Sequence, residues 1–146
     1  MKKEFMVVDR ITKKGEYVDL TPEGAKKIKE KAKEANFTII EGTPKTLLLD
    51  LDSWEAECRY DAMYSMLCMN FGAREKSRWK SKSGKGVHVV ISLKDDLDET
   101  TRVALQAIMS SDPKREMFGI VKILNDVEEP SLLFKPPQKD TGTATT

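Results

Sequence analysis

Two aspartates at the end of a leucine-rich run are the first residues of this sequence whose types and spacing could do chemistry. Asp50 and Asp52 stand in the segment LLLDLDS, each directly after a leucine. Side chains alternate across an extended strand, so both carboxylates share a face, with their Cα atoms separated by a rise of about 6.6 Å. Two carboxylates at this spacing can converge on hard cations. The simpler alternative is that these aspartates end a strand or cap the helix that follows.

The only histidine of the chain, His88, stands in the segment SKSGKGVHVVISL. The apolar residues around it alternate, which places them on one face of a strand and His88 on the other. Before it, Ser83 and Lys85 lie in a glycine-containing turn that can offer backbone N–H groups, a hydroxyl and an ammonium to phosphate oxygens. The turn is not a P-loop, because Gly-Lys is followed here by glycine and a strand. A satisfied structural histidine is the alternative.

A basic segment separates these two motifs. Between residues 74 and 85 a single acid, Glu75, stands against six basic residues, with Trp79 among them. The basic residues are Arg74, Lys76, Arg78, Lys80, Lys82 and Lys85. Basic side chains interleaved with an aromatic ring suit a nucleic-acid backbone and a stacked base. A solvated loop with a packed tryptophan is the plain alternative.

The elements that must position these groups follow from periodicity and capping signals. Strands are expected over residues 4–11, 37–41, 47–52, 87–93 and 131–134, with a turn at Gly15. Helices are expected over residues 21–36, from Ser53 to about residue 71, around residues 104–109, and from Asp112-Pro113 onward. Their expected core-facing residues are Tyr60, Met63, Tyr64, Leu67, Cys68, Phe71, Ala104, Leu105, Ile108, Met109, Met117, Ile120, Val121 and Leu124. This mixture predicts an α+β fold with helices packed on one face of the sheet.

Length and composition set the limits of these interpretations. The 146 residues predict one domain over residues 1–135 and a disordered tail over residues 136–146. No apolar run approaches the roughly 18 residues of a membrane span. The net charge of +1 gives no evidence of a polyanionic partner. Cys58 and Cys68 are expected to be buried thiols of a cytoplasmic protein.

Together the motifs resemble the archaeo-eukaryotic primase superfamily. Its first motif is hydrophobic-Asp-hydrophobic-Asp, as at residues 49–52, and its second is Ser-x-His. The segment SKSGKGVHVVISL is especially similar to the second motif of plasmid or phage primase-polymerases and of the polymerase domains attached to bacterial end-joining ligases. The resemblance covers roughly residues 46–134.

The resemblance implies an RRM-like antiparallel sheet, the minimal catalytic core of a primase, and a DNA primase or polymerase activity that adds nucleotides to a 3′-hydroxyl. Asp50 and Asp52 would bind Mg²⁺ or Mn²⁺, and His88 with Ser83 and Lys85 would bind the triphosphate of the nucleotide. The implied partners are single-stranded or primed DNA, or RNA, together with nucleotides and a replication helicase or accessory domain. A cytoplasmic protein of archaeal, bacterial, viral or plasmid origin is expected.

One motif of the family departs from its pattern. Its third motif, a hydrophobic residue followed by Asp, is expected within REMFGIVKILND, where Phe118 is followed by Gly119. The acids available nearby are Asp112, Glu116, Asp126 and Glu128, and Asp112 is also explained as a helix cap. Two other functions therefore stay open. One is a non-catalytic relative that binds nucleic acid or nucleotide in a replication complex, and the other is a metal-dependent nuclease.

Overall fold

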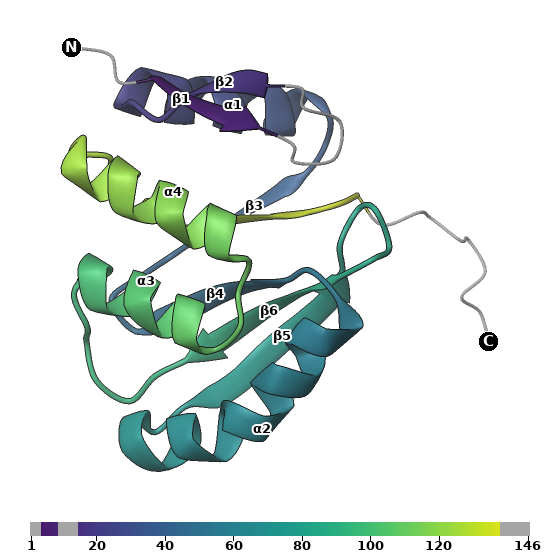
Figure 1. Cartoon of the computed structure of the whole chain (residues 1–146), viewed down its shortest axis with the longest axis vertical. Helices are drawn as coiled ribbons and strands as arrows, with labels where there is room; N and C mark the ends of the chain where they lie inside the picture. The colour runs from purple at the N-terminus through teal and green to yellow at the C-terminus, as the bar shows by residue number, and fades with distance from the viewer. Residues whose placement is uncertain (1–3, 9–14, 138–146) are drawn as a thin grey trace.

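The computed structural model describes residues 4–8 and 15–137. The end of the expected first strand and most of the expected tail, residues 9–14 and 138–146, lie outside this part of the chain. Four helices and seven strands are assigned within it, and all paired strands are antiparallel (Figure 1). The α+β class is therefore confirmed.

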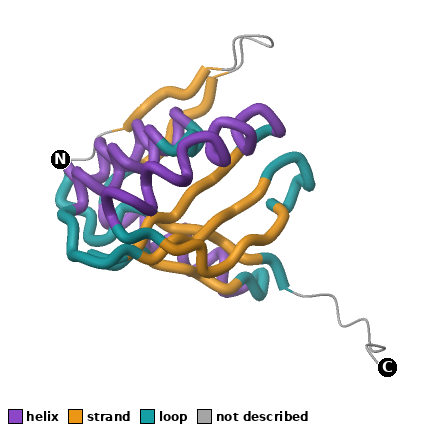
Figure 2. Tube along the Cα trace, turned by 90° about the horizontal axis from the view of Figure 1, so that it is seen from below, coloured by secondary structure: helices purple, strands orange, loops and turns teal. Residues whose placement is uncertain are grey.

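A three-stranded sheet forms the centre of the molecule. Its strands are β4 (Thr46–Leu51), β5 (Arg74–Lys80) and β6 (Val87–Ser92), in the order β4-β6-β5. Figure 2 shows strands through the middle of the molecule with helices on either side of them. The leucines of β4 alternate as expected, and Leu47, Leu49 and Leu51 are fully buried on one face.

Helix α2 (Trp54–Phe71) covers that face. Ser53 caps it by accepting a hydrogen bond from the Ala56 N–H, and Gly72 ends it in the left-handed conformation. Its core-facing stripe is confirmed, because Tyr60 and Leu67 are buried in the cluster around the leucines. The cysteine prediction is wrong: Cys58 is exposed and Cys68 half-buried, because Cys58 lies outside the stripe. Both thiols are free.

A second sheet pairs two strands that are far apart in the sequence. Strand β3 (Thr38–Glu41) pairs with β7 (Leu132–Lys135). Helix α1 (Pro22–Glu34) precedes β3 and is capped by Thr21 with Pro22 at its first position. A strand pair at the N-terminus, β1 (Glu4–Val8) with β2 (Gly15–Asp19), completes the fold. Gly15 thus begins a strand, where a closing turn was expected.

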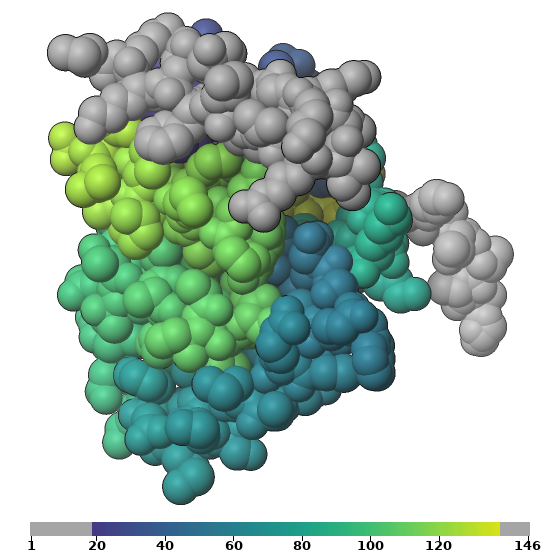
Figure 3. Space-filling model, in the orientation of Figure 1, coloured from purple at the N-terminus to yellow at the C-terminus, as the bar shows by residue number. Residues whose placement is uncertain are grey.

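Helices α3 (Glu99–Ile108) and α4 (Pro113–Leu124) pack together beside β4. In the space-filling view they form one continuous surface with α2 (Figure 3). The expected buried faces are partly wrong, because Ile108, Met117 and Leu124 are each more than half exposed. The buried residues of α4 are instead Glu116, Gly119 and Val121. Gly119 permits close approach to Val103 of α3, and Glu116 joins a polar network. Because neither residue is a large apolar one, apolar spacing does not predict that this side is buried.

No helix among the described residues is long and apolar enough to cross a membrane.

Candidate functional site

Asp50 and His88 face each other on neighbouring strands. The β4–β6 register pairs Asp50 with His88, and the β5–β6 register pairs His88 with Trp79. These three side chains make a row across the sheet, on the face opposite the leucines and α2. Strand alternation therefore does here what the sequence predicts: it separates the polar residues from the core.

The imidazole of His88 is held between its two neighbours in this row. Its Nε2 lies 3.4 Å from Oδ1 of Asp50. Its ring meets that of Trp79 edge to face, with the centroids 5.6 Å apart. The His88 Nδ1 and the Trp79 Nε1 are buried and have no hydrogen-bond partner among the described residues. The Nε2 atom is thus the nitrogen of His88 that stands beside a carboxylate.

Asp52 lies one residue beyond the end of β4 and is exposed. Burial raises the pKa of its carboxyl, and the negative charges of Asp112 and Asp50 raise it further, while the Lys85 ammonium opposes them. Three carboxylates are therefore close enough to repel one another. The structure brings Asp112, one of the four acids considered for the missing third motif, to this cluster.

Asp112 also has the helix-capping role expected of it. Its Oδ1 accepts a hydrogen bond from the Lys114 N–H at 3.3 Å, and its own N–H donates to the Asp50 carbonyl at 2.8 Å. The cap of α4 is thereby fixed to the strand that carries Asp50. The two interpretations of Asp112, as a cap and as a site acid, are compatible.

Side chains from α3, α4 and the turn between them form hydrogen bonds with the backbone groups at the outer edge of β4, where a neighbouring strand would otherwise lie. The Leu48 N–H donates to Oε1 of Gln106 at 2.9 Å, and the Asp50 N–H donates to Oγ of Ser111 at 2.9 Å. The Arg115 guanidinium donates to the Leu48 carbonyl at 2.8 Å. Together with the hydrogen bond from Asp112 to the Asp50 carbonyl, these bonds fix the backbone on both sides of the Asp50 side chain.

Glu116 lies at the centre of this edge network. Its buried carboxylate accepts hydrogen bonds from Gln106 at 2.7 Å, from Ser111 at 2.6 Å and from Arg115. Gln106 also donates to Ser131, just before β7, at 3.0 Å. Glu116 thus has a structural role. No sequence signal indicates this network, because its members are single polar residues in separate segments of the chain.

The loop between β5 and β6 packs against the end of β4. A Cβ on Gly86 would lie 2.3 Å from the Leu51 carbonyl oxygen, so only glycine fits there. The Ser81 N–H donates to the Gly86 carbonyl at 2.9 Å, which closes the loop. The Ser83 hydroxyl accepts from the Lys85 N–H at 3.3 Å. The glycine-containing turn thus lies directly beside Asp52, as the expected site requires.

Two cavities meet at Asp50 and His88. The first, here the loop-side cavity, has a volume of about 510 Å³ and lies between α1 and the β5–β6 loop. Its polar lining residues are Lys31, Asp50, Asp52, Ser81, Lys82, Ser83 and His88, with Phe37 and Phe134 among the apolar ones. Lys85 does not line it, although its charge acts on Asp52.

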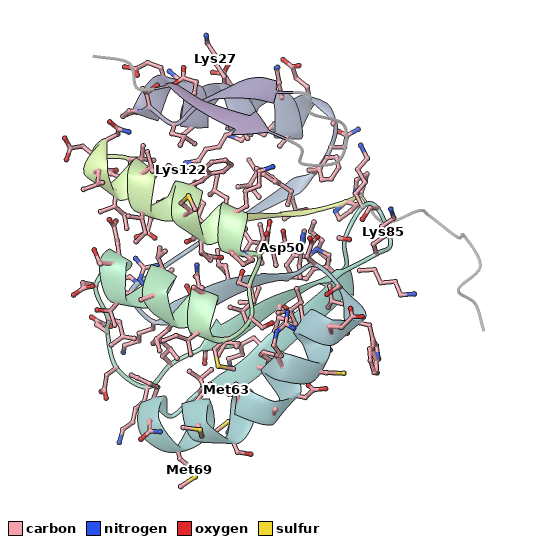
Figure 4. The ribbon with its side chains drawn as sticks, in the orientation of Figure 1. Lys27, Asp50, Met63, Met69, Lys85 and Lys122 are labelled. Carbon is pink, nitrogen blue, oxygen red and sulfur yellow. The ribbon has the colours of Figure 1, made fainter. Side chains whose placement is uncertain are left out.

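The second, here the α4-side cavity, has a volume of about 450 Å³. Asp112, Lys114, Arg115, Phe118 and Lys122 of the α4 region line it together with Asp50, His88 and Phe134. In Figure 4 the labelled Asp50 lies near the middle of the molecule, between the labelled Lys122 and the loop that carries Lys85. The Asp50–His88 pair is thus common to both cavities.

The expected basic strip does not form one surface. Arg78 turns toward α2, where it binds Glu75 at 2.8 Å and Glu57 at 3.6 Å and lies over Tyr60. Trp79 points to the opposite face, beside His88, with the Lys135 ammonium over its ring. Alternation along β5 divides the segment between two faces. Arg74, Lys76, Lys80 and Lys82 are exposed.

Some residues of the site were missed by sequence reasoning. Lys31 looked like one of many lysines on a solvated helix face, yet it lines the loop-side cavity. Lys114 and Lys122 line the other cavity. The only available signal was their four-residue spacing around Phe118, which cannot show what the helix faces.

The chain matches no protein-family model, and neither a curated protein nor a solved structure matches it.

Proposed function

We propose that this protein is a metal-dependent nucleotidyltransferase, a DNA primase or polymerase in activity, that adds nucleotides to the 3′-hydroxyl of a nucleic-acid strand. The observation that carries the proposal is the Asp50–His88 pair, with Asp52 beside it, at the junction of two cavities that both contain lysines. Carboxylates at the centre and cations on both sides suit a reaction between two phosphate-bearing substrates.

The carboxylates fit Mg²⁺ or Mn²⁺ by their chemistry. Asp50 and Asp52 offer hard oxygen atoms, and Mg²⁺ commonly uses one or two carboxylates together with water and substrate phosphates. Burial raises the pKa of Asp52, the charges of Asp112 and Asp50 raise it further, and a bound dication would relieve the repulsion among these carboxylates. No group of three or more acidic, histidine or cysteine side chains among the described residues is arranged to hold a metal by itself. When bound, the ion would supply charge neutralisation at the reacting phosphate.

The residues of the loop-side cavity would hold the triphosphate. Lys31 and Lys82 contribute positive charge from opposite walls, and Ser83 and His88 contribute hydrogen-bonding groups. Lys85, expected in this role, would act from the loop beside Asp52. In the reaction, the 3′-oxygen bonds to the α-phosphorus, and the bond from that phosphorus to the oxygen bridging to the β-phosphate breaks. The bonding electron pair leaves with pyrophosphate, and the hydroxyl proton passes to solvent.

The RRM-like architecture belongs with this proposal. It is supported by the three antiparallel strands β4-β6-β5, with α2 on one face and Asp50 and His88 on the other.

The test is incorporation of labelled nucleotide on a primed template with Mn²⁺. Asp50→Asn and Asp52→Asn should each abolish incorporation, whereas Asp95→Asn, an exposed acid outside both cavities, should leave it unchanged. Absence of incorporation by the unaltered protein, or incorporation that survives in both site variants, contradicts the proposal.

A binding protein without catalysis is the second candidate, and the lysines that line both cavities favour it, because they suit phosphate groups with or without a metal. It predicts strand or nucleotide binding without a metal requirement and without incorporation. Degradation of a labelled strand in the absence of nucleotide would instead indicate a nuclease that uses the same carboxylates.

A further inference from the structure

Helix α4 presents a basic–aromatic–basic stripe to the α4-side cavity. Lys114, Phe118 and Lys122 follow one another at four-residue intervals, and all three line that cavity. Four residues correspond to a rise of about 6 Å, so the three side chains stand in a row along one side of the helix. Alternating cations and aromatic rings are the pattern that single-stranded nucleic acid binds, through its phosphates and its stacked bases.

The two lysines of this stripe have no carboxylate partner within the described residues. Lys114 makes no ion pair there, and the Lys122 ammonium has a single hydrogen bond, 3.4 Å to the Pro130 carbonyl. Burial lowers the pKa of Lys122 and the Arg115 charge lowers it further, while the Glu116 carboxylate opposes this shift only in part. A half-buried ammonium with one neutral acceptor gains stability from an added anion.

The other charged groups of the cavity are already engaged. Arg115 binds Glu116 and two backbone carbonyls, of Leu48 and Leu132. Glu116 also accepts from two further side chains of the edge network, and Asp50 stands beside His88. Asp112 caps α4. The available charge of the cavity is therefore the positive charge of the two stripe lysines.

We infer that the α4-side cavity binds the end of the acceptor strand, with backbone phosphates at Lys114 and Lys122 and a base against Phe118. The inference rests on the proposed function. In phosphoryl transfer the attacking and leaving oxygens lie roughly in line on opposite sides of the phosphorus. With pyrophosphate leaving toward the loop-side cavity, the 3′-hydroxyl arrives from the other side of the Asp50–His88 pair, where the stripe lies.

The alternative occupant is the nucleoside part of the incoming nucleotide. Its sugar and base carry no charge, so they leave both lysines without an anion, while the triphosphate already has Lys31 and Lys82 in the loop-side cavity. A strand supplies a phosphate at every nucleotide. The charge of the stripe thus favours the strand.

The first experiment measures strand binding by fluorescence anisotropy, with a labelled single-stranded oligonucleotide and without metal or nucleotide. Lys114→Gln and Lys122→Met should each weaken binding about tenfold and reduce the slope of log affinity against log salt by about 0.7, the value for one phosphate contact. Phe118→Leu should weaken binding without changing the slope. Lys27→Gln is the matched control, because Lys27 points away from the site (Figure 4), and it should bind like the unaltered protein.

The second experiment separates the two substrates in the incorporation reaction. The stripe variants should raise the KM for the strand and leave the KM for nucleotide unchanged, and Lys31→Gln should do the reverse. Unchanged strand binding in the stripe variants, or an effect on the nucleotide KM alone, overturns the inference. Strand binding that depends on the stripe, without any incorporation, overturns nucleotidyl transfer and leaves the strand site standing. If Lys122→Met does not fold, the exposed Lys114 decides the outcome.

Discussion

The carboxyl group of Asp52 has a raised pKa. Its pKa is raised by burial and by Asp112 and Asp50, and it is opposed only by Lys85. Asp50, two residues earlier and within β4, is instead beside the imidazole of His88. At the scale of single residues, the two aspartates of one motif therefore differ: Asp50 lies beside an imidazole, and Asp52 lies near two other acids.

This difference predicts that Asp52→Asn stabilises the protein at pH 7 when no divalent cation is present. A raised pKa means that the folded state binds the proton more tightly than the unfolded chain, so stability falls as the pH rises from 3.8 through the raised value. The asparagine has no proton to lose in this range, so the variant keeps the stability that the unaltered protein loses. Its melting temperature should therefore exceed that of the unaltered protein at pH 7. Below pH 3.8, where both states are protonated, the gain should vanish.

Thermal melting between pH 3 and pH 8 measures this effect, with Asp95→Asn as the control for the loss of an exposed charge. A lower melting temperature for Asp52→Asn at pH 7 would show that the carboxylate is stabilising, and the repulsion argument would be wrong.

At the scale of elements, the position of Asp50 depends on helices that are distant in sequence. Strand β4 has β6 on one side only, and Gln106, Ser111 and Arg115 satisfy its other edge. Gln106 also connects this edge directly to Ser131, the residue before β7, and all three side chains donate to Glu116. The edge network thus joins three elements at the strand that carries the site.

We expect Ser111→Ala to lower the free energy of unfolding by about 1–3 kcal/mol, because it leaves the Asp50 N–H without its acceptor and removes a donor to Glu116. Urea denaturation measures the change. Ser110→Ala is the matched control, since within the described part of the chain its hydroxyl has one side-chain hydrogen bond, from the exposed Arg59. It should change stability by less than about 0.5 kcal/mol. Equal effects of the two substitutions would contradict the role of the network.

At the scale of the whole molecule, the C-terminal strand completes both cavities. Strand β7 pairs with β3, and its Phe134 lines the loop-side and the α4-side cavity. Leu133 on the same strand is 2% exposed, whereas Leu124 at the end of α4 is 69% exposed. The packing of β7 therefore links the stability of the molecule to the shape of its site.

Two leucine substitutions test this packing. Leu133→Ala should cost about 2–5 kcal/mol of unfolding free energy, as expected for a leucine truncated in a core. Leu124→Ala should cost less than about 0.5 kcal/mol, because its side chain is mostly in water. Chemical denaturation measures both, and a large cost for Leu124→Ala would restore the buried face that apolar spacing predicts for α4.

Ligand binding should also be visible in the stability of the whole molecule. At a ligand concentration about 100-fold above Kd, Mn²⁺ with a non-hydrolysable nucleoside triphosphate should raise the melting temperature by about 5 °C or more. A doubly substituted Asp50→Asn, Asp52→Asn protein should lose this rise, and Asp95→Asn should keep it. An equal rise in the doubly substituted protein would place the ligand elsewhere.

The sequence alone was sufficient for the strand faces and the helix starts that carry the site. Alternation in LLLDLDS and in VHVVIS predicted which side chains leave the core, and Ser53 and Asp112-Pro113 predicted where α2 and α4 begin. These signals are local, since a strand has a period of two and a cap acts within one helical turn. The α+β class followed from them.

Tertiary structure alone decided which of these groups meet. Antiparallel register set His88 opposite Asp50, the end of α3 brought Asp112 to the same place, and the pairing of β3 with β7 closed the cavities. Likewise, only packing decided that Arg78 contacts α2, that the stripe of α4 faces a cavity, and that Met117 and Leu124 face water. The physical reason is that the local sequence pattern around a residue indicates which face of its element it occupies. Its partner on that face, however, comes from a segment tens of residues away.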